Sequence, residues 1–125
     1  MNAKDRIKNW QNESKADLES ASEYINKDRL LHGLFLCHLA IEKSLKALIV
    51  SITNNAAPKI HDILELAQFA KIEFTKEELA FINILIKYKL HGRYPKGSSE
   101  IPSKNYSNNL CKESKDFINK LAKSL

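Results

Sequence analysis

The chain has 125 residues, a formal net charge of +5, and 28% charged residues. This length allows one hydrophobic core and excludes two, so we expect a single domain over residues 1–125. The basic balance favours acidic or phosphate-bearing partners, but the Lys residues are spread along the chain as on an ordinary solvated surface, so RNA is not the favoured partner.

Apolar residues recur at spacings of three and four in five segments, and only three Gly and three Pro interrupt the chain. The predicted helices cover residues 3–27, 29–52, 61–70, 75–91 and 104–123. We expect Asp28 to N-cap the second helix, and Thr75 with Glu78 to form a capping box on the fourth. With no sustained alternation typical of strands, the prediction is an all-α, antiparallel up-and-down bundle of about five helices.

The helix over residues 29–52 is apolar around most of its circumference, which is typical of a central helix buried on nearly all sides. His38, Glu42 and Lys46 are spaced four apart and lie on one stripe, with Lys43 beside it. This line of ionisable groups predicts either a simple ion pair, a dimer interface or a ligand site. The same charges exclude a membrane span.

The two cysteines have no metal-ligand spacing, and the four histidines form no HExxH motif, so we expect no metal and no cofactor. Cys37 lies in the apolar helix and is interpreted as a small hydrophobic residue. With no signal peptide at the start of the sequence, we expect a reduced, cytoplasmic protein that does not enter the membrane.

Three segments stand in a characteristic order: HLAIEKSLKALI in the central helix, HDILELA from His61, and RYP at residues 93–95. In this order and spacing they resemble the HEPN domain (higher eukaryotes and prokaryotes nucleotide-binding), and the resemblance covers nearly the whole chain. It implies a helical domain, often homodimeric, similar to the C-terminal domain of kanamycin nucleotidyltransferase. Such domains are commonly encoded beside, or fused to, small nucleotidyltransferases, and are proposed to bind nucleotides or the substrate.

Another branch of HEPN proteins consists of ribonuclease toxins of toxin–antitoxin pairs, whose motif is Arg followed by His after four to six residues. This chain departs from that motif, because no histidine follows Arg93, and neither Arg6 nor Arg29 has one at the required offset. The acid–base group of that reaction is therefore missing where the motif would place it.

A nucleotide or phosphate ligand needs fixed positive donors, and Arg93 offers a planar guanidinium next to Tyr94, which can stack on a base. Lys43 and Lys46 add charge from the central helix, and His61 stands at a helix start. The full set of candidate ligand-binding residues is Arg93, Tyr94, Lys43, Lys46, Glu42, His38, His61 and Asp62.

Three interpretations remain open at this point. The first is a non-catalytic accessory module that binds a nucleotide and partners a separate nucleotidyltransferase. The second is an enzyme, a divergent ribonuclease whose acid–base group has moved to His91 or His61. The third is a structural helical homodimer that buries its central helix against a twin. The absence of a Gly-rich phosphate loop or a catalytic carboxylate pair favours the first.

Overall fold

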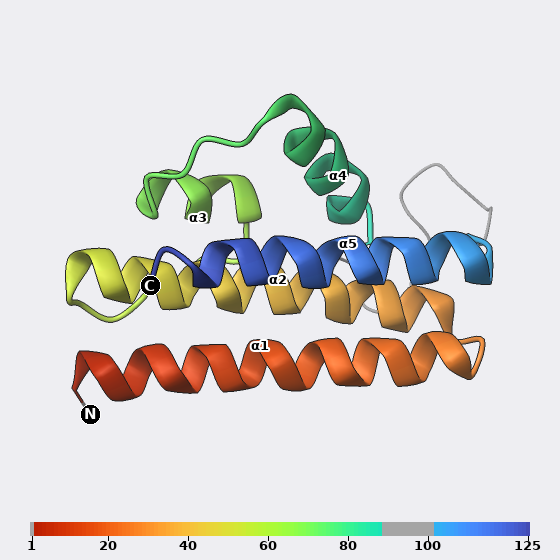
Figure 1. Cartoon of the computed structure of the whole chain (residues 1–125), viewed down its shortest axis with the longest axis horizontal. Coiled ribbons are helices and arrows are strands. Elements are labelled where there is room, and N and C mark those ends of the chain that lie inside the picture. The colour runs from red at the N-terminus through yellow and green to blue at the C-terminus, as the bar shows by residue number, and fades with distance from the viewer. Residues whose placement is uncertain (1, 89–101) are drawn as a thin grey trace.

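The structure, a computed structural model, describes residues 2–88 and 102–125 of the chain. These residues form five α-helices and no strand, which confirms the all-α prediction (Figure 1). The helices are α1 (Ala3–Asn26), α2 (Leu30–Thr53), α3 (Ile63–Phe69), α4 (Lys76–Ile86) and α5 (Lys104–Ala122).

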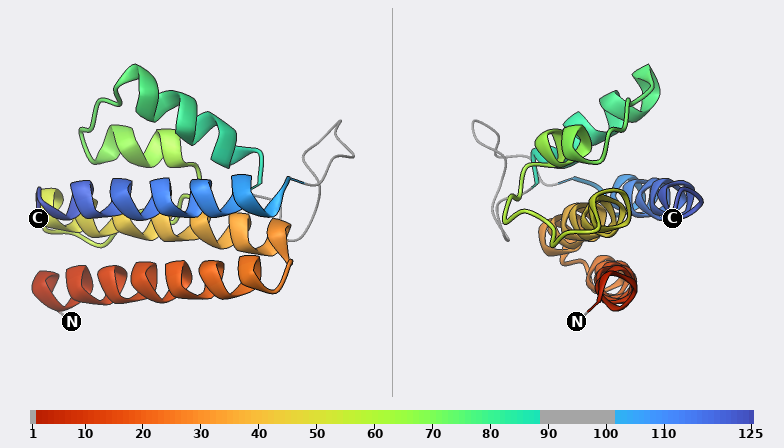
Figure 2. Two further views of the ribbon diagram at one scale, coloured as in Figure 1. Left: turned by 45° about the vertical axis from the view of Figure 1, so that its right-hand side comes forward. Right: turned by 90° about the vertical axis from the view of Figure 1, so that its left-hand side faces the viewer.

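The three long helices lie side by side, and the two short ones cover them from one side (Figure 1). Seen end-on, α2 and α5 form a middle layer, with α1 on one side of it and α3 and α4 on the other (Figure 2). The helices α1 and α2 run antiparallel, whereas α5 runs in the same direction as α2 (Figures 1 and 2). Because α2 contacts each of the other four helices, it is the central helix that its apolar pattern predicts.

The core of the bundle is built around α2, where Leu34, Ile41 and Leu45 are completely buried. Burying a Leu or Ile side chain of this size contributes about 1.5–3 kcal/mol. The α1–α2 contact is especially close at Gly33, where an added Cβ would stand 2.5 Å from a side-chain carbon of Ile25. A glycine is required there because the neighbouring helix fills the space that a side chain would need.

The helix starts follow the local sequence with one exception. Thr75 and Glu78 form the predicted capping box on α4, with Glu78 N–H donating to the Thr75 hydroxyl over 3.1 Å and Thr75 N–H donating to the Glu78 carboxylate over 3.0 Å. The prediction that Asp28 caps the second helix is wrong: Arg29 occupies the N-cap without a side-chain hydrogen bond. Asp28 instead adopts a left-handed φ of 63° that closes the short turn after α1, a conformation that Asp tolerates better than most residues.

The helix α4 ends at Ile86, earlier than the predicted end at residue 91. The N–H groups of Lys87 and Tyr88 donate to the carbonyls of Ile84 and Leu85, three residues back, which is the tightened geometry of a terminating helix. The apolar spacing in the sequence continues beyond this turn. Periodicity alone therefore predicted a longer helix than the structure contains. Within residues 2–88 and 102–125, no helix is long and apolar enough to cross a membrane.

Candidate functional site

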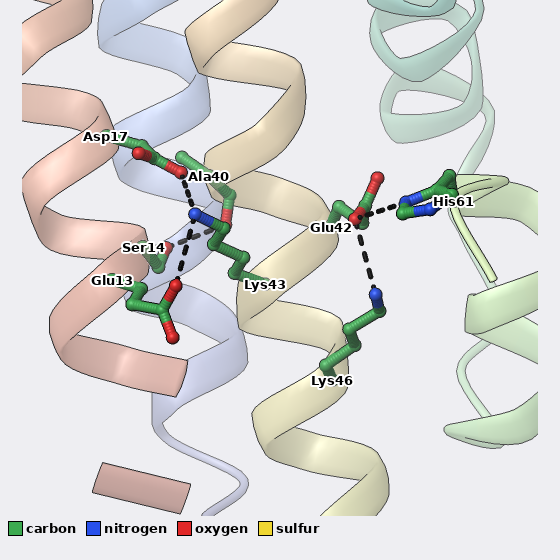
Figure 3. A network of polar contacts seen from close by, with 8 residues as sticks. All are labelled: Glu13, Ser14, Asp17, Ala40, Glu42, Lys43, Lys46 and His61. Atoms are coloured by element: carbon green, nitrogen blue, oxygen red, sulfur yellow. Dashed lines mark hydrogen bonds and ion pairs between the residues drawn. The ribbon is translucent and has the colours of Figure 1, made fainter. Parts of the chain in front are cut away.

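The polar stripe of α2 meets the start of α3 at Glu42, which forms the centre of a small ionisable cluster (Figure 3). One carboxylate oxygen, Oε2, accepts a hydrogen bond from Lys46 Nζ over 3.4 Å, one helical turn further along α2. The same oxygen lies 3.1 Å from Nδ1 of His61, which stands just before the N-cap of α3. The predicted ion pair between Glu42 and Lys46 is therefore present, and a residue 19 positions away joins it.

The cluster combines buried charge with an exposed imidazole. The side chains of Glu42 and Lys46 are 4% and 7% exposed, whereas that of His61 is 80% exposed. This ion pair is thus shielded from solvent, unlike an ordinary surface pair. The attraction between the two charges offsets the free-energy cost of burying each of them. The His61 ring is the part of the cluster that solvent and solutes can reach.

The second carboxylate oxygen of Glu42, Oε1, differs from Oε2 in its hydrogen bonding. Oε1 is buried and has no hydrogen-bond partner among the described residues. A buried carboxylate oxygen without a donor costs free energy, and native structures satisfy nearly all such atoms. Within the part of the chain that the structure describes, Glu42 therefore has an unused acceptor, Oε1, beside an oxygen that already has two partners.

Lys43 does not belong to this cluster, although it is adjacent to Glu42 in sequence. Its ammonium points to α1, where it lies 2.9 Å from the Asp17 carboxylate and 3.4 Å from that of Glu13 (Figure 3). Burial alone would lower the pKa of Lys43, but hydrogen bonds and attraction from Asp17 and Glu13 raise it overall. Glu42 and Lys43 are consecutive and point about 100° apart around α2, so Glu42 reaches His61 at the start of α3 while Lys43 ties α2 to α1.

The remaining predicted site residues have separate positions. His38 is buried on α2, one turn before Glu42. Asp62 is the N-cap of α3, and its carboxylate accepts the N–H groups of Leu64 and Glu65 over 2.9 and 3.3 Å. Arg93 and Tyr94 lie outside the described residues. The structure thus brings together Glu42, Lys46 and His61, and it separates Lys43 from them.

One residue that contacts this cluster, Trp10, was not expected from the sequence. The ammonium of Lys46 lies 5.2 Å from the centre of the Trp10 ring of α1, within the range of a cation–π interaction. Trp10 and Lys46 are 36 positions apart, and no local spacing in the sequence links them. Among the described residues, no group of three or more His, Cys, Asp or Glu side chains could hold a metal ion.

Comparison with known proteins agrees with the fold and identifies the family. The fold is that of a small all-α domain with a buried central helix and two short helices laid across one side. The family model of the HEPN domain matches residues 7–125, so the chain belongs to the HEPN family, as its three motifs predicted.

Among solved structures, the chain is similar to the crystal structure of TT1696 from Thermus thermophilus. The two share 17% sequence identity with a TM-score of 0.79, and the match covers 96% of this chain and 98% of the other. Structural similarity at this level of sequence identity shows that the two proteins share a fold. A search of curated proteins finds no match to the sequence.

Proposed function

We propose that this HEPN domain is a non-catalytic accessory module that binds a nucleotide, or a similar phosphate-bearing ligand, at the cluster of Glu42, Lys46 and His61. The observation that supports the proposal most is the buried Glu42 carboxylate, which has one oxygen shared by two cationic or polar partners and one without a donor among the described residues. Buried ionisable groups whose hydrogen bonding is incomplete are typical of ligand sites.

The ligand chemistry follows from these groups. The unused oxygen of Glu42 is an acceptor, so it suits a ligand that supplies an O–H or N–H group, such as a ribose hydroxyl or a base amine. Lys46 is a charged donor and the His61 ring can donate an N–H group, so both suit an anion such as a phosphate. A nucleotide carries both donor and phosphate. Because the His61 ring is exposed, it is the part of the cluster that a ligand contacts first.

The family membership supports the same class of ligand. We further propose that the module acts in the cytoplasm as a homodimer and serves a separate nucleotidyltransferase, which would carry out the chemistry. Arg93 is not followed by any histidine, so the ribonuclease motif of the toxin branch is missing from the sequence. Light scattering at micromolar concentration tests the dimer, and monomer alone would contradict it.

The decisive experiment is isothermal titration of the purified chain with ATP and a small panel of other nucleotides. We expect a dissociation constant between about 1 μM and 1 mM. Lys46→Met keeps the length of the side chain but removes the charge, so we expect at least about tenfold weaker binding. His61→Ala is expected to weaken binding by about threefold to tenfold.

Lys43→Met is the matched control, because it removes the same charge from the same helix at a residue that pairs with Glu13 and Asp17 of α1 instead of Glu42. Its affinity should stay within about twofold of the unsubstituted protein. Arg93→Ala tests separately whether the RYP segment at residues 93–95 contributes to nucleotide binding. Binding that is weakened equally by Lys43→Met and Lys46→Met, or no binding of any nucleotide by the unsubstituted chain, would contradict the assignment of the site.

A further inference from the structure

Two neighbouring hollows lie on the side of the bundle where α1 faces α5. One has a volume of about 440 Å³ and lies towards the start of α5, and the other has a volume of about 330 Å³ and lies towards its end. Lys15, Leu18 and Lys115 line both of them, so the two hollows form one continuous groove, which we call the α1–α5 groove. Its lining residues include no member of the Glu42 cluster, so the groove is separate from the candidate site.

The groove follows from the way the long helices pack. Both α1 and α5 pack on α2, and they contact each other less than either contacts α2 (Figure 2). Ser14 of α1 and Ser44 of α2 line the groove and are buried, so they form its floor. The Ser14 hydroxyl already has a partner, because it donates to the Ala40 carbonyl over 2.7 Å. Side chains this small fill little of the space between the two outer helices, which therefore stays open.

The length of the groove matches that of a short helix. Along α1 the lining residues run from Gln11 to Ser22, and along α5 they run from Asn108 to Ala122. At the rise of an α-helix, these spans are about 17 and 21 Å, the length of a helix of about 11 to 14 residues. A helix laid along the groove would contact α1 and α5 together and complete a four-helix bundle with α2.

The middle and one end of the groove are apolar. Leu18 of α1 and Ile118 of α5 are half-buried, so part of each side chain still faces water. Leu125 lines the same end and is 42% exposed. Covering these side chains would remove apolar surface from water, which is the main driving force when a helix docks through its apolar face.

The rim of the groove is basic. Lys15, Lys112 and Lys115 are exposed along it, whereas Glu19 is the one carboxylate among the described residues that line it. Within residues 2–88 and 102–125, none of these three ammonium groups takes part in an ion pair. Three like charges along one groove favour a partner of the opposite charge.

We propose that the α1–α5 groove binds an amphipathic helix of a partner protein, with an apolar stripe against Leu18 and Ile118 and with Asp or Glu residues that pair with the lysines of the rim. The occupant is an acidic partner rather than a second copy, because the chain itself has a net charge of +5. The homodimer proposed above would therefore use another surface. This inference does not rest on nucleotide binding, because the groove shares no residue with the Glu42 cluster.

The test uses two synthetic peptides of about 14 residues that are stapled as helices. They share one leucine stripe and differ only at the flanking positions, which are Glu in one peptide and Lys in the other. Fluorescence anisotropy with the full chain should give a dissociation constant of about 10–100 μM for the Glu peptide and at least about tenfold weaker binding of the Lys peptide. Because the rim is exposed, a higher salt concentration should weaken the binding of the Glu peptide.

Charge reversal on the rim tests where the peptide binds. Lys15→Glu together with Lys115→Glu should weaken binding of the Glu peptide by at least about tenfold and strengthen binding of the Lys peptide. The matched control is Lys76→Glu together with Lys87→Glu, which makes the same change in net charge on α4, on the other side of the α2–α5 layer from α1 (Figure 2). Its affinity for the Glu peptide should stay within about twofold. All four lysines are exposed, so these changes leave the core intact.

Failure to bind either peptide, equal affinity for both, or an equal loss in the rim variant and the control would overturn the proposal. So would nuclear magnetic resonance shifts that, on addition of the Glu peptide, change only in α3 and α4. Leu18→Glu tests for a second copy in the groove. If this change converts a dimer into a monomer in light scattering, the groove is a contact between copies and the assignment to a partner helix is wrong.

Discussion

Replacing Lys46 by Met tests whether the ion pair on α2 is a buried element of the fold or an ordinary surface contact. Met has nearly the same length, so it keeps the packing of the side chain against Trp10 but removes the ammonium. The Glu42 carboxylate, 4% exposed, then loses the cation that lies 3.4 Å from its Oε2 and keeps only His61. An exposed pair would lose little from this change, whereas a buried one loses much.

The expected magnitude follows from the distance and the burial. At 3.4 Å and an effective dielectric constant of about 20, the attraction between the two charges is about 5 kcal/mol, and it offsets the cost of burying them. Removing one partner of a buried pair typically costs about 3–5 kcal/mol. Because the separation is long for a charge-assisted hydrogen bond and His61 remains, we expect about 3 kcal/mol, or a midpoint of thermal unfolding lowered by roughly 10 °C.

The assay is equilibrium unfolding in urea, followed by far-ultraviolet circular dichroism and by the fluorescence of Trp10, the one tryptophan in the chain. In a double-mutant cycle, Lys46→Met and Glu42→Gln together should cost at least about 1.5 kcal/mol less than the two single changes added, because the pair is removed as a unit. A loss below about 0.5 kcal/mol for Lys46→Met, or strict additivity in the cycle, would refute the reasoning.

Three further predictions concern packing, capping and pH. Gly33→Ala should lower the free energy of unfolding by about 1–3 kcal/mol despite the better helix propensity of Ala, because its Cβ would overlap Ile25; an unchanged urea midpoint would contradict the close α1–α2 contact. Thr75→Ala removes one side of the capping box and should cost about 1 kcal/mol in the same assay, whereas Thr75→Ser should cost little. The pKa of Lys43 is raised in the folded state, so its stabilisation is fully present below its unfolded pKa near 10.5 and is lost as the pH rises through the folded value. The difference in unfolding free energy between the unsubstituted protein and Lys43→Met should thus be constant from about pH 7 to 9 and shrink above about pH 10.5, and a constant difference at all pH values would argue against the ion pair with Asp17.

The features that the sequence predicted correctly are those that depend on near neighbours along the chain. The starts of α4 and α5, the capping box at Thr75 and the ion pair between Glu42 and Lys46 all involve residues three or four positions apart, a spacing that a helix brings together regardless of the rest of the fold. The burial of α2 also followed from its sequence, because a helix that is apolar on nearly all sides has to be covered. The errors at Asp28 and at the end of α4 concern helix boundaries, where a single turn decides between two conformations.

The sequence by itself therefore determined the all-α class, the central helix, most helix boundaries and the family, because helix formation and apolar periodicity are local properties. Tertiary structure alone decided which polar residues meet. It paired Lys43 with α1 and Lys46 with Trp10, and it brought His61 to Glu42 across a loop. Such contacts depend on how the helices are rotated and stacked against one another, and that arrangement is set by the packing of the whole core rather than by any short segment.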